Sequence, residues 1–276
     1  MGAGLFALSA MAVSGREVSA ELDTFELMLY RSLIGLPVVL GIAWALGGLR
    51  TLPTQRPGLH LLRNLLHFSA QNLWFHALAI IPLAQVFALE FTTPIWVILL
   101  APLVLREPIT RSGALAALLG FLGILVIVRP GVTALLPAHG AALLAAIGFA
   151  GNVLVTKQLS ATQSTLCILF WMTLMQAVMA LLCALPGGLV LPSMALAPWL
   201  LVLGLCGIAA HFCITQALRC APATVVAPMD FLRLPLIAVV GMLLYGEPLE
   251  AAVFAGGALI VLGNLVNIRG QRSAGA

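Results

Sequence analysis

The chain has 276 residues, of which 62% are hydrophobic and only 8% are charged, and its mean hydropathy is +1.13. Soluble domains carry about 25% charged residues, so this composition excludes a soluble globular protein and indicates an integral membrane protein. The formal net charge of +4 usually reflects topology in such a protein, and no basic, aromatic-interleaved patch appears. We therefore expect the lipid bilayer and a small molecule as partners, and no nucleic acid.

Apolar segments of helix length follow one another along the whole chain. A helix that spans a bilayer needs about 20 largely apolar residues, and charges, prolines and glycines divide the chain at that spacing. The first segment lacks a basic start, so we interpret it as a transmembrane helix and not a cleaved signal. The sequence thus predicts an all-α polytopic membrane protein with ten transmembrane helices at 2–21, 26–46, 58–80, 83–105, 112–128, 139–159, 165–185, 196–218, 223–245 and 250–268.

The segment from Pro82 to Pro108 recurs at Pro222 to Pro248, with the same offset at every matched position. Glu90 in the first copy corresponds in position to Asp230 in the second, and each copy ends in the dipeptide Glu-Pro. Matching without a gap over so long a stretch indicates internal duplication. We predict two five-helix repeats, 1–130 and 139–270, followed by a cytoplasmic tail at 271–276.

The basic residues indicate the orientation of the helices. If the N-terminus is cytoplasmic, all the Lys and Arg outside or at the ends of the spans, Arg63 included, lie on the cytoplasmic side except Arg16 and Arg129. The positive-inside rule then places both termini in the cytoplasm. Because five helices are an odd number, the second repeat enters from the opposite side, which makes the repeats inverted. Inverted repeats are typical of alternating-access transporters that bind substrate near the bilayer midplane.

Three features together resemble the EamA branch of the drug/metabolite transporter (DMT) superfamily: YRSLIGLP at 30–37, FHALAIIPLAQVFALEFTTPIWVILLAPLVLREPI at 75–109, and the echo of the latter in the second half. The resemblance covers essentially the whole chain. It implies a ten-helix, two-repeat protein of the inner membrane that moves small metabolites, often exporting amino acids or their derivatives. Arg106 departs from the family, which more often has glycine there, and we expect it to alter a loop end.

Charged side chains within the spans are candidate functional groups, because a charge near the bilayer centre costs about 2.5–3.5 kcal/mol even on insertion scales. Glu90 and Asp230 each lie about two turns into their helix, from opposite faces. They can grip a zwitterion or relay a proton, or else serve as protonated acids bonded to neighbouring helices. Arg233 shares a helix face with Asp230 and either neutralises it or binds a carboxylate. Arg31 snorkels to the interface, or binds a substrate carboxylate or a buried acid.

The third span carries a polar face, because Asn64, His67 and Gln71 follow the spacing i, i+3, i+7. Such a stripe predicts a cavity wall, although either histidine in this helix can be structural when taken alone. Pro94 and Pro235 are expected to break their helices near the acids, which is tolerated beside a cavity. The residues predicted to bind substrate or line the transport cavity are Arg31, His67, Gln71, Trp74, His76, Glu90, Trp96, Asn152, Trp171, Asp230 and Arg233.

These observations predict a secondary transporter of the cell inner membrane that exports amino acids or their derivatives by alternating access, with possible proton coupling. One alternative is uptake of a nucleoside- or vitamin-like metabolite. Another is an intramembrane enzyme on lipid-linked substrates, which lacks the acidic metal-binding cluster it needs.

We expect no enzymatic activity, cofactor or metal, since no Walker A, HExxH or GxSxG motif occurs. The five cysteines form no CxxC pair and are expected to pack as small apolar residues. Glycines at 113, 120, 123, 256 and 263 predict close helix packing within one molecule, and hence a monomer or weak homodimer.

Overall fold

The computed structural model describes residues 2–105, 109–129, 136–226 and 233–274. These residues form α-helices joined by short connections, and no strand occurs among them. The helices are α1 (Gly2–Val18), α2 (Thr24–Ala45), α3 (Pro57–Ile80), α4 (Leu83–Glu90), α5 (Thr93–Val104), α6 (Arg111–Val128), α7 (Pro137–Ser160), α8 (Thr165–Ala184), α9 (Ala197–Cys220), α10 (Ala223–Val226), α11 (Arg233–Tyr245) and α12 (Ala251–Ala274).

The observed helices closely match the predicted spans. In the ninth span the described residues form α10 and α11, and residues 227–232 lie outside the described range. Two of the other spans differ from the prediction. The fourth predicted span is divided into α4 and α5, and α12 runs to Ala274, past its predicted end and into the predicted tail. In the part of the chain that the structure describes, six segments are long and apolar enough to cross a membrane, and α4 with α5 counts as one of them. The protein is therefore a multi-pass membrane protein, and the count of ten spans stays a prediction.

Several helices begin where the sequence supplies a capping group. Asp23 accepts a hydrogen bond from the Glu26 amide at 2.8 Å, and the Glu26 carboxylate accepts one from the Asp23 amide at 3.1 Å. This reciprocal capping box satisfies two of the free N–H groups at the start of α2. Ser164 caps α8 in the simpler way, accepting from the Cys167 amide at 3.1 Å.

The break between α4 and α5 falls directly after Glu90. Pro94 lies in the first turn of α5, where its missing N–H costs nothing. The Thr92 hydroxyl donates to the Leu89 carbonyl at 2.8 Å, and the Thr93 hydroxyl donates to the Glu90 carbonyl at 2.6 Å. The Thr93 bond satisfies a carbonyl that the break leaves free, whereas the Leu89 carbonyl also accepts from the Thr92 amide. The prediction that Pro94 interrupts this helix is confirmed, and the break places Glu90 at the end of a helix.

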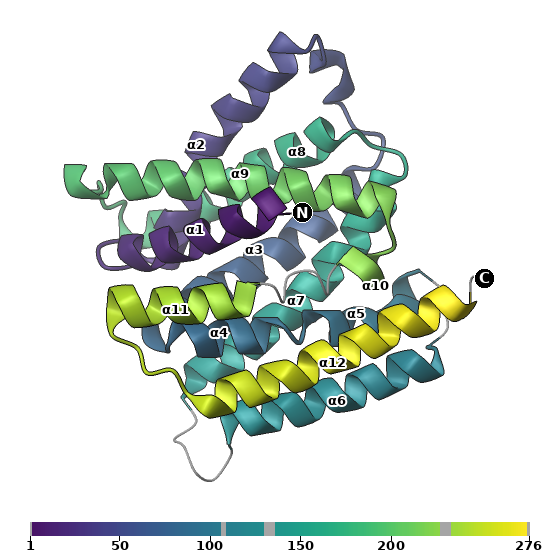
Figure 1. Ribbon diagram of the computed structural model, residues 1–276. Coiled ribbons are helices and arrows are strands. Elements are labelled where there is room, and N and C mark those ends of the chain that lie inside the picture. The colour runs from purple at the N-terminus through teal and green to yellow at the C-terminus, as the bar shows by residue number, and fades with distance from the viewer. Residues whose placement is uncertain (1, 106–108, 130–135, 227–232, 275–276) are drawn as a thin grey trace.

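Each of the main helix pairs joins a helix from the first half of the chain to one from the second half: α1 with α9, α2 with α8, α3 with α7, α4 with α11 and α6 with α12. Figure 1 shows α6 and α12 side by side along one edge of the molecule, with α2 and α8 at the opposite edge. The remaining helices lie between, and the largest apolar core combines their buried side chains with some from the two edge pairs.

The pair α6 and α12 meets backbone to backbone. A Cβ atom at Gly123 would lie 2.6 Å from the Gly256 carbonyl oxygen, and one at Gly256 would lie 2.5 Å from the Gly123 oxygen. Only glycine permits this approach. For these two residues, the prediction that glycines pack helices within the molecule is confirmed.

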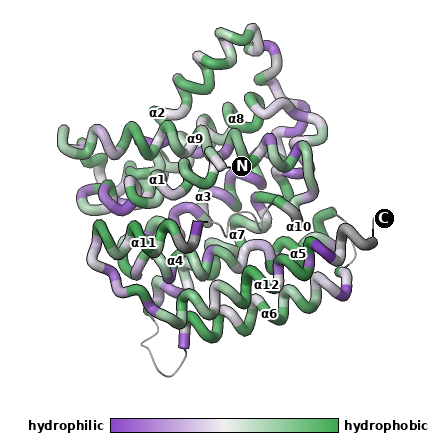
Figure 2. Tube along the Cα trace, viewed as in Figure 1, coloured by the Kyte–Doolittle hydropathy of each residue, from purple (hydrophilic) through white to green (hydrophobic). Residues whose placement is uncertain are grey.

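Many large apolar side chains are exposed on the outside of the helices, and Figure 2 shows that hydrophobic residues predominate along most of the helices. Trp44, Leu103, Met194 and Leu243 are each more than two-thirds exposed. An apolar exterior of this extent is costly in water and matches a lipid environment, in which the helical backbone satisfies its own hydrogen bonds.

Candidate functional site

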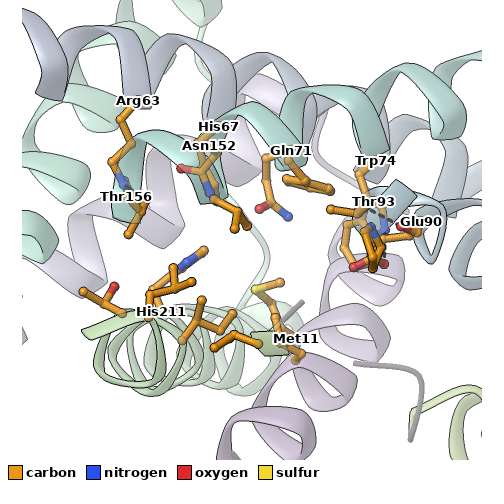
Figure 3. A pocket seen from close by; sticks show the side chains of 18 of the residues that line it. Met11, Arg63, His67, Gln71, Trp74, Glu90, Thr93, Asn152, Thr156 and His211 are labelled. Carbon is orange, nitrogen blue, oxygen red and sulfur yellow. Dashed lines mark hydrogen bonds between the residues drawn. The ribbon is translucent and has the colours of Figure 1, made fainter. Parts of the chain in front are cut away.

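A cavity of about 90 Å³ lies among the helices. It is bounded by α1, α3, α4, α5, α7, α9, α10 and α11. Figure 3 shows the side chains that surround it. The polar lining residues are Arg63, His67, Gln71, Trp74, Glu90, Thr93, Asn152, Thr156, His211, Thr215 and Arg233.

Helix α3 supplies one long wall of the cavity. Arg63, His67, Gln71 and Trp74 lie on successive turns of one face, because residues three and four apart are neighbours on a helix. They are spread over about 16 Å of the helix at 1.5 Å per residue. In Figure 3, Arg63 lies at one end of this row and Trp74 at the other. The cavity therefore has two polar ends.

At the Trp74 end, the Glu90 carboxylate is held by two donors. The Trp74 indole Nε1 donates to Glu90 Oε2 at 2.8 Å, and Arg233 Nη2 donates to Glu90 Oε1 at 3.0 Å. The Arg233 guanidinium also lies 5.0 Å from the Phe87 ring centroid, which is cation–π geometry. Because Arg233 and Glu90 form an ion pair, their charges offset each other at this end of the cavity.

At the opposite end, Arg63 is 1% exposed. Its Nε donates to Thr156 Oγ1 at 2.9 Å, and its Nη1 donates to Asn64 Oδ1 at 3.3 Å. The His67 and His211 rings meet edge to face with their centroids 4.6 Å apart. This end therefore carries a positive charge among neutral polar groups.

Arg31 lies behind this end of the cavity and does not line it. It is 4% exposed, and its Nη2 donates to Gln176 Oε1 at 3.5 Å. Gln176 in turn contacts His67 Nδ1 at 2.7 Å. The structure thus buries Arg31 and joins it to the cavity wall through one amide side chain.

Of the residues predicted from the sequence, six line the cavity: His67, Gln71, Trp74, Glu90, Asn152 and Arg233. Asp230 lies outside the described residues. The others are placed elsewhere. His76 is exposed, Trp96 Nε1 donates to Thr92 at 3.1 Å, and Trp171 Nε1 donates to the Leu52 carbonyl at 3.0 Å.

The sequence reasoning missed Arg63 and Thr156 as cavity residues, and it left His211 out of the predicted set. The sequence analysis assigned Arg63 to the charges at cytoplasmic loops and helix ends. The Arg63 side chain is instead buried. Its place four residues before His67, on the polar face of the helix, was a signal that could have found it. In the described portion of the chain, no three His, Cys, Asp or Glu residues gather as metal ligands would.

A model of the EamA-like transporter family matches residues 2–129 and again residues 136–269. The chain belongs to the EamA-like transporter family. This confirms the resemblance seen in the sequence, and it makes the protein a membrane transporter of small molecules, within the DMT superfamily, and not an enzyme.

Named relatives differ in what they carry. This EamA protein is 27% identical over 283 residues to the S-adenosylmethionine uptake transporter of Rickettsia bellii (strain RML369-C), covering 99% of this chain and 95% of that one. It is 32% identical over 232 residues to the riboflavin transporter of Brucella anthropi, covering 80% of each chain. It is 31% identical over 263 residues to the pseudopaline exporter CntI of Pseudomonas aeruginosa, covering 93% and 90%.

A solved crystal structure shares the fold, with a TM-score of 0.71 at 20% sequence identity, and the match covers 100% of this chain and 99% of that one.

Proposed function

We propose that this EamA-family protein takes up a nucleoside- or vitamin-like metabolite, which binds in the cavity along α3. The observation that carries this proposal is the cavity itself, since it lies inside a membrane protein and is lined by Arg63, His67, Trp74 and Glu90. Sites of this kind combine apolar walls with a few fixed polar groups. The relatives named for S-adenosylmethionine uptake and riboflavin transport support this substrate class.

The chemistry of the cavity wall suits a flat ring with a polar tail. Trp74, Phe91 and Phe149 supply aromatic surface that can stack on or pack edge-on against a heteroaromatic ring. Gln71, Asn152 and the two polar ends supply hydrogen-bonding groups. S-adenosylmethionine and riboflavin each combine a heteroaromatic ring with a polar chain.

The sequence alone favoured export of amino acids or their derivatives. None of the relatives described above is named for amino-acid transport, and one is named for uptake. The uptake alternative therefore replaces it as our proposal. Export remains the competing direction, because the pseudopaline exporter is also similar over nearly the whole chain.

The proposed cycle is alternating access between two inverted repeats, 1–130 and 139–270, in the cell inner membrane with both termini in the cytoplasm. Two features support it. The family model matches the chain twice. In addition, if α1 corresponds to α7 and α3 to α9, the pair α1 with α9 maps onto the pair α7 with α3, as a two-fold relation requires. In a proton-coupled cycle, Glu90 takes up a proton when its contact with Arg233 opens.

Intact cells of a strain that lacks the endogenous transporters would test the proposal. Cells that express the protein are given radiolabelled S-adenosylmethionine or riboflavin in the medium, beside cells that carry an empty vector and cells that express Glu90→Gln. Accumulation of either compound that depends on the wild-type protein supports uptake. Faster loss of the compound from preloaded cells, without accumulation, would instead establish export, and no movement of either compound would overturn the substrate class.

A further inference from the structure

Two buried arginines near the cavity have no carboxylate partner in the described residues. The ion pairs among the described residues are Arg16–Glu247, Arg129–Glu250 and Arg233–Glu90. None of them involves Arg31 or Arg63. In the described residues, the polar partners of these two side chains are a hydroxyl, amide oxygens and thioether sulfurs. A buried charge without an opposite charge is costly, so a bound anion would offset a cost that this part of the protein otherwise carries.

Arg63 retains hydrogen-bonding capacity at its outermost nitrogen. Its Nε and Nη1 are occupied by Thr156 and Asn64, but its Nη2 contacts only the Met172 sulfur, at 3.7 Å. Thioether sulfur is a weak acceptor. Met172 does not line the cavity, so an oxyanion on the cavity side of the guanidinium adds a strong acceptor without breaking the bonds that fix this group.

The orientation of the Gln176 amide follows from its neighbours. Arginine only donates, so the contact of Arg31 Nη2 at 3.5 Å identifies the Gln176 oxygen. The Gln176 nitrogen then faces Asn64 Oδ1 at 3.3 Å, an atom identified as oxygen because it also accepts from Arg63. Arg31 and Asn64 therefore fix the same orientation from two sides.

This orientation determines the tautomer of His67. The Gln176 nitrogen donates to His67 Nδ1 at 2.7 Å, so Nδ1 accepts and the ring proton resides on Nε2. His67 lines the cavity and is 1% exposed, and its Nε2 has no hydrogen-bond partner in the part of the chain that the structure describes. A donor without a partner is thus buried at the cavity end that also holds Arg63.

We infer that the Arg63 end of the cavity binds a carboxylate group of the transported metabolite, which lies against the Arg63 guanidinium and accepts a hydrogen bond from His67 Nε2–H. Gln176 is a positioning residue, since it acts through the His67 tautomer. The inference rests on the proposed function in taking the cavity as the substrate site. It restricts the substrate to an anion or zwitterion whose carboxylate lies away from Glu90, because Glu90 occupies the opposite end (Figure 3). Of the two compounds named above, S-adenosylmethionine carries a carboxylate and riboflavin does not, so the inference selects the first.

The test uses the full-length protein in lipid nanodiscs, with its histidine rings labelled with ¹⁵N. The protein is titrated with benzoate and, as a neutral match of the same shape, with benzamide. We expect an Nε2–H resonance for His67 that benzoate shifts and that benzamide at equal concentration leaves in place. Equal responses to the two compounds, or a His67 proton on Nδ1, would overturn the inference.

Two variants and one control test which side chains are responsible for the benzoate response. Arg63→Gln removes the charge and should weaken benzoate binding at least about tenfold, in line with a charge-assisted hydrogen bond. Gln176→Met keeps the volume but removes the donor to Nδ1, so the His67 signal should divide between two tautomers and the benzoate response should fall. The control Arg56→Gln changes an exposed arginine at the start of the same helix and should bind benzoate as the wild type does.

Each result separates the inference from the proposed function, because benzoate binding needs no transport. If Arg63→Gln fails to fold, Gln176→Met carries the test alone. Wild-type benzoate affinity in both variants would contradict the carboxylate site even if the cells accumulate S-adenosylmethionine or riboflavin. Conversely, a site that binds benzoate as described, in a protein that moves neither compound, would remove only the proposed function.

Discussion

Arg233 and Glu90 join the two halves of the chain at the cavity, with Arg233 Nη2 3.0 Å from Glu90 Oε1. Glu90 ends α4, and Arg233 begins α11. The Glu90 side chain is 13% exposed and that of Arg233 only 1%. A carboxylate in the first half thus compensates a buried cation in the second half, so any movement of the halves against each other must alter this pair.

Replacing Glu90 with Gln should impair both transport and stability. Removing one partner of a buried ion pair costs about 3–5 kcal/mol when burial is complete. Because Glu90 is partly exposed, we expect the lower end of this range. Uptake by Glu90→Gln cells should fall at least about tenfold, and thermal unfolding of the purified variant should begin at a lower temperature.

The double variant Glu90→Gln/Arg233→Gln separates these two effects. It removes both charges, so the thermal stability lost in the single variant should largely return, while uptake stays low. If the double variant is no more stable than Glu90→Gln, the ion pair does not stabilise the fold as we argue. Full uptake in either variant would remove Glu90 from the transport site.

The Trp74 indole offers a milder change at the same end. Trp74→Phe keeps an aromatic ring in the wall but removes the Nε1–H that donates to Glu90 Oε2 at 2.8 Å. Loss of a hydrogen bond to a charged group costs about 1.5–3 kcal/mol, and we expect a weaker apparent substrate affinity with much of the maximal rate retained. Uptake measured over a range of substrate concentrations distinguishes the two parameters, and an unchanged affinity would contradict a role for this bond.

The sequence predicted the helices well because apolar length and Gly, Pro or charged interruptions are local signals. It also predicted the break beside Glu90, because Pro94 cannot continue the preceding helix. The polar stripe on the third helix led to His67 and Gln71, since spacing alone shows that they share a face. What local patterns cannot give is the partner on another helix. The contact between Glu90 and Arg233 spans 143 positions of the chain, and no periodicity encodes it.

Two tryptophans also show that local sequence patterns do not identify contacts with other segments. Trp96 and Trp171 were predicted to bind substrate or line the cavity, yet each donates its Nε1–H elsewhere, to Thr92 and to the Leu52 carbonyl. Which face of a helix meets the cavity depends on how the helices rotate against one another, which composition does not specify. Arg63 was overlooked because a cation near a helix start usually lies at the interface, whereas Thr156 of α7 and Asn64 of α3 bind this one inside the protein.

The close packing of α6 and α12 predicts the effect of a single methyl group. In Gly123→Ala the new Cβ would lie 2.6 Å from the Gly256 carbonyl oxygen, and backbone atoms cannot move aside as a side chain can. Overpacking of this kind costs about 1–3 kcal/mol. The matched control is Gly140→Ala, also within a helix, where a Cβ meets nothing within 4 Å. Thermal unfolding should show Gly123→Ala less stable than wild type and Gly140→Ala at least as stable, and the reverse order would contradict the packing.

A carboxylate from the second half also caps a helix of the first half, away from the cavity. Helix α4 has Pro82 at its N-cap and no side-chain cap of its own, so its first N–H groups need an external acceptor. Glu247 Oε2 accepts from the Leu83 amide at 2.9 Å, while its other oxygen pairs with Arg16 of α1. Negative charge is favourable at a helix start, so Glu247 ties α1 and α4 to the connection that precedes α12.

Removing this carboxylate should loosen the start of α4 without changing its sequence. In Glu247→Ala, the Leu83 amide loses its acceptor, and a hydrogen bond to a charged group is worth about 1.5–3 kcal/mol. Hydrogen–deuterium exchange at Leu83 in nanodiscs should therefore become at least about tenfold faster. The control Glu21→Ala removes an exposed carboxylate that accepts from Ser193 and should leave Leu83 unchanged. If Leu83 exchanges at the wild-type rate in Glu247→Ala, this contact does not hold α4 in the membrane, and the two halves must be joined at this end by other residues.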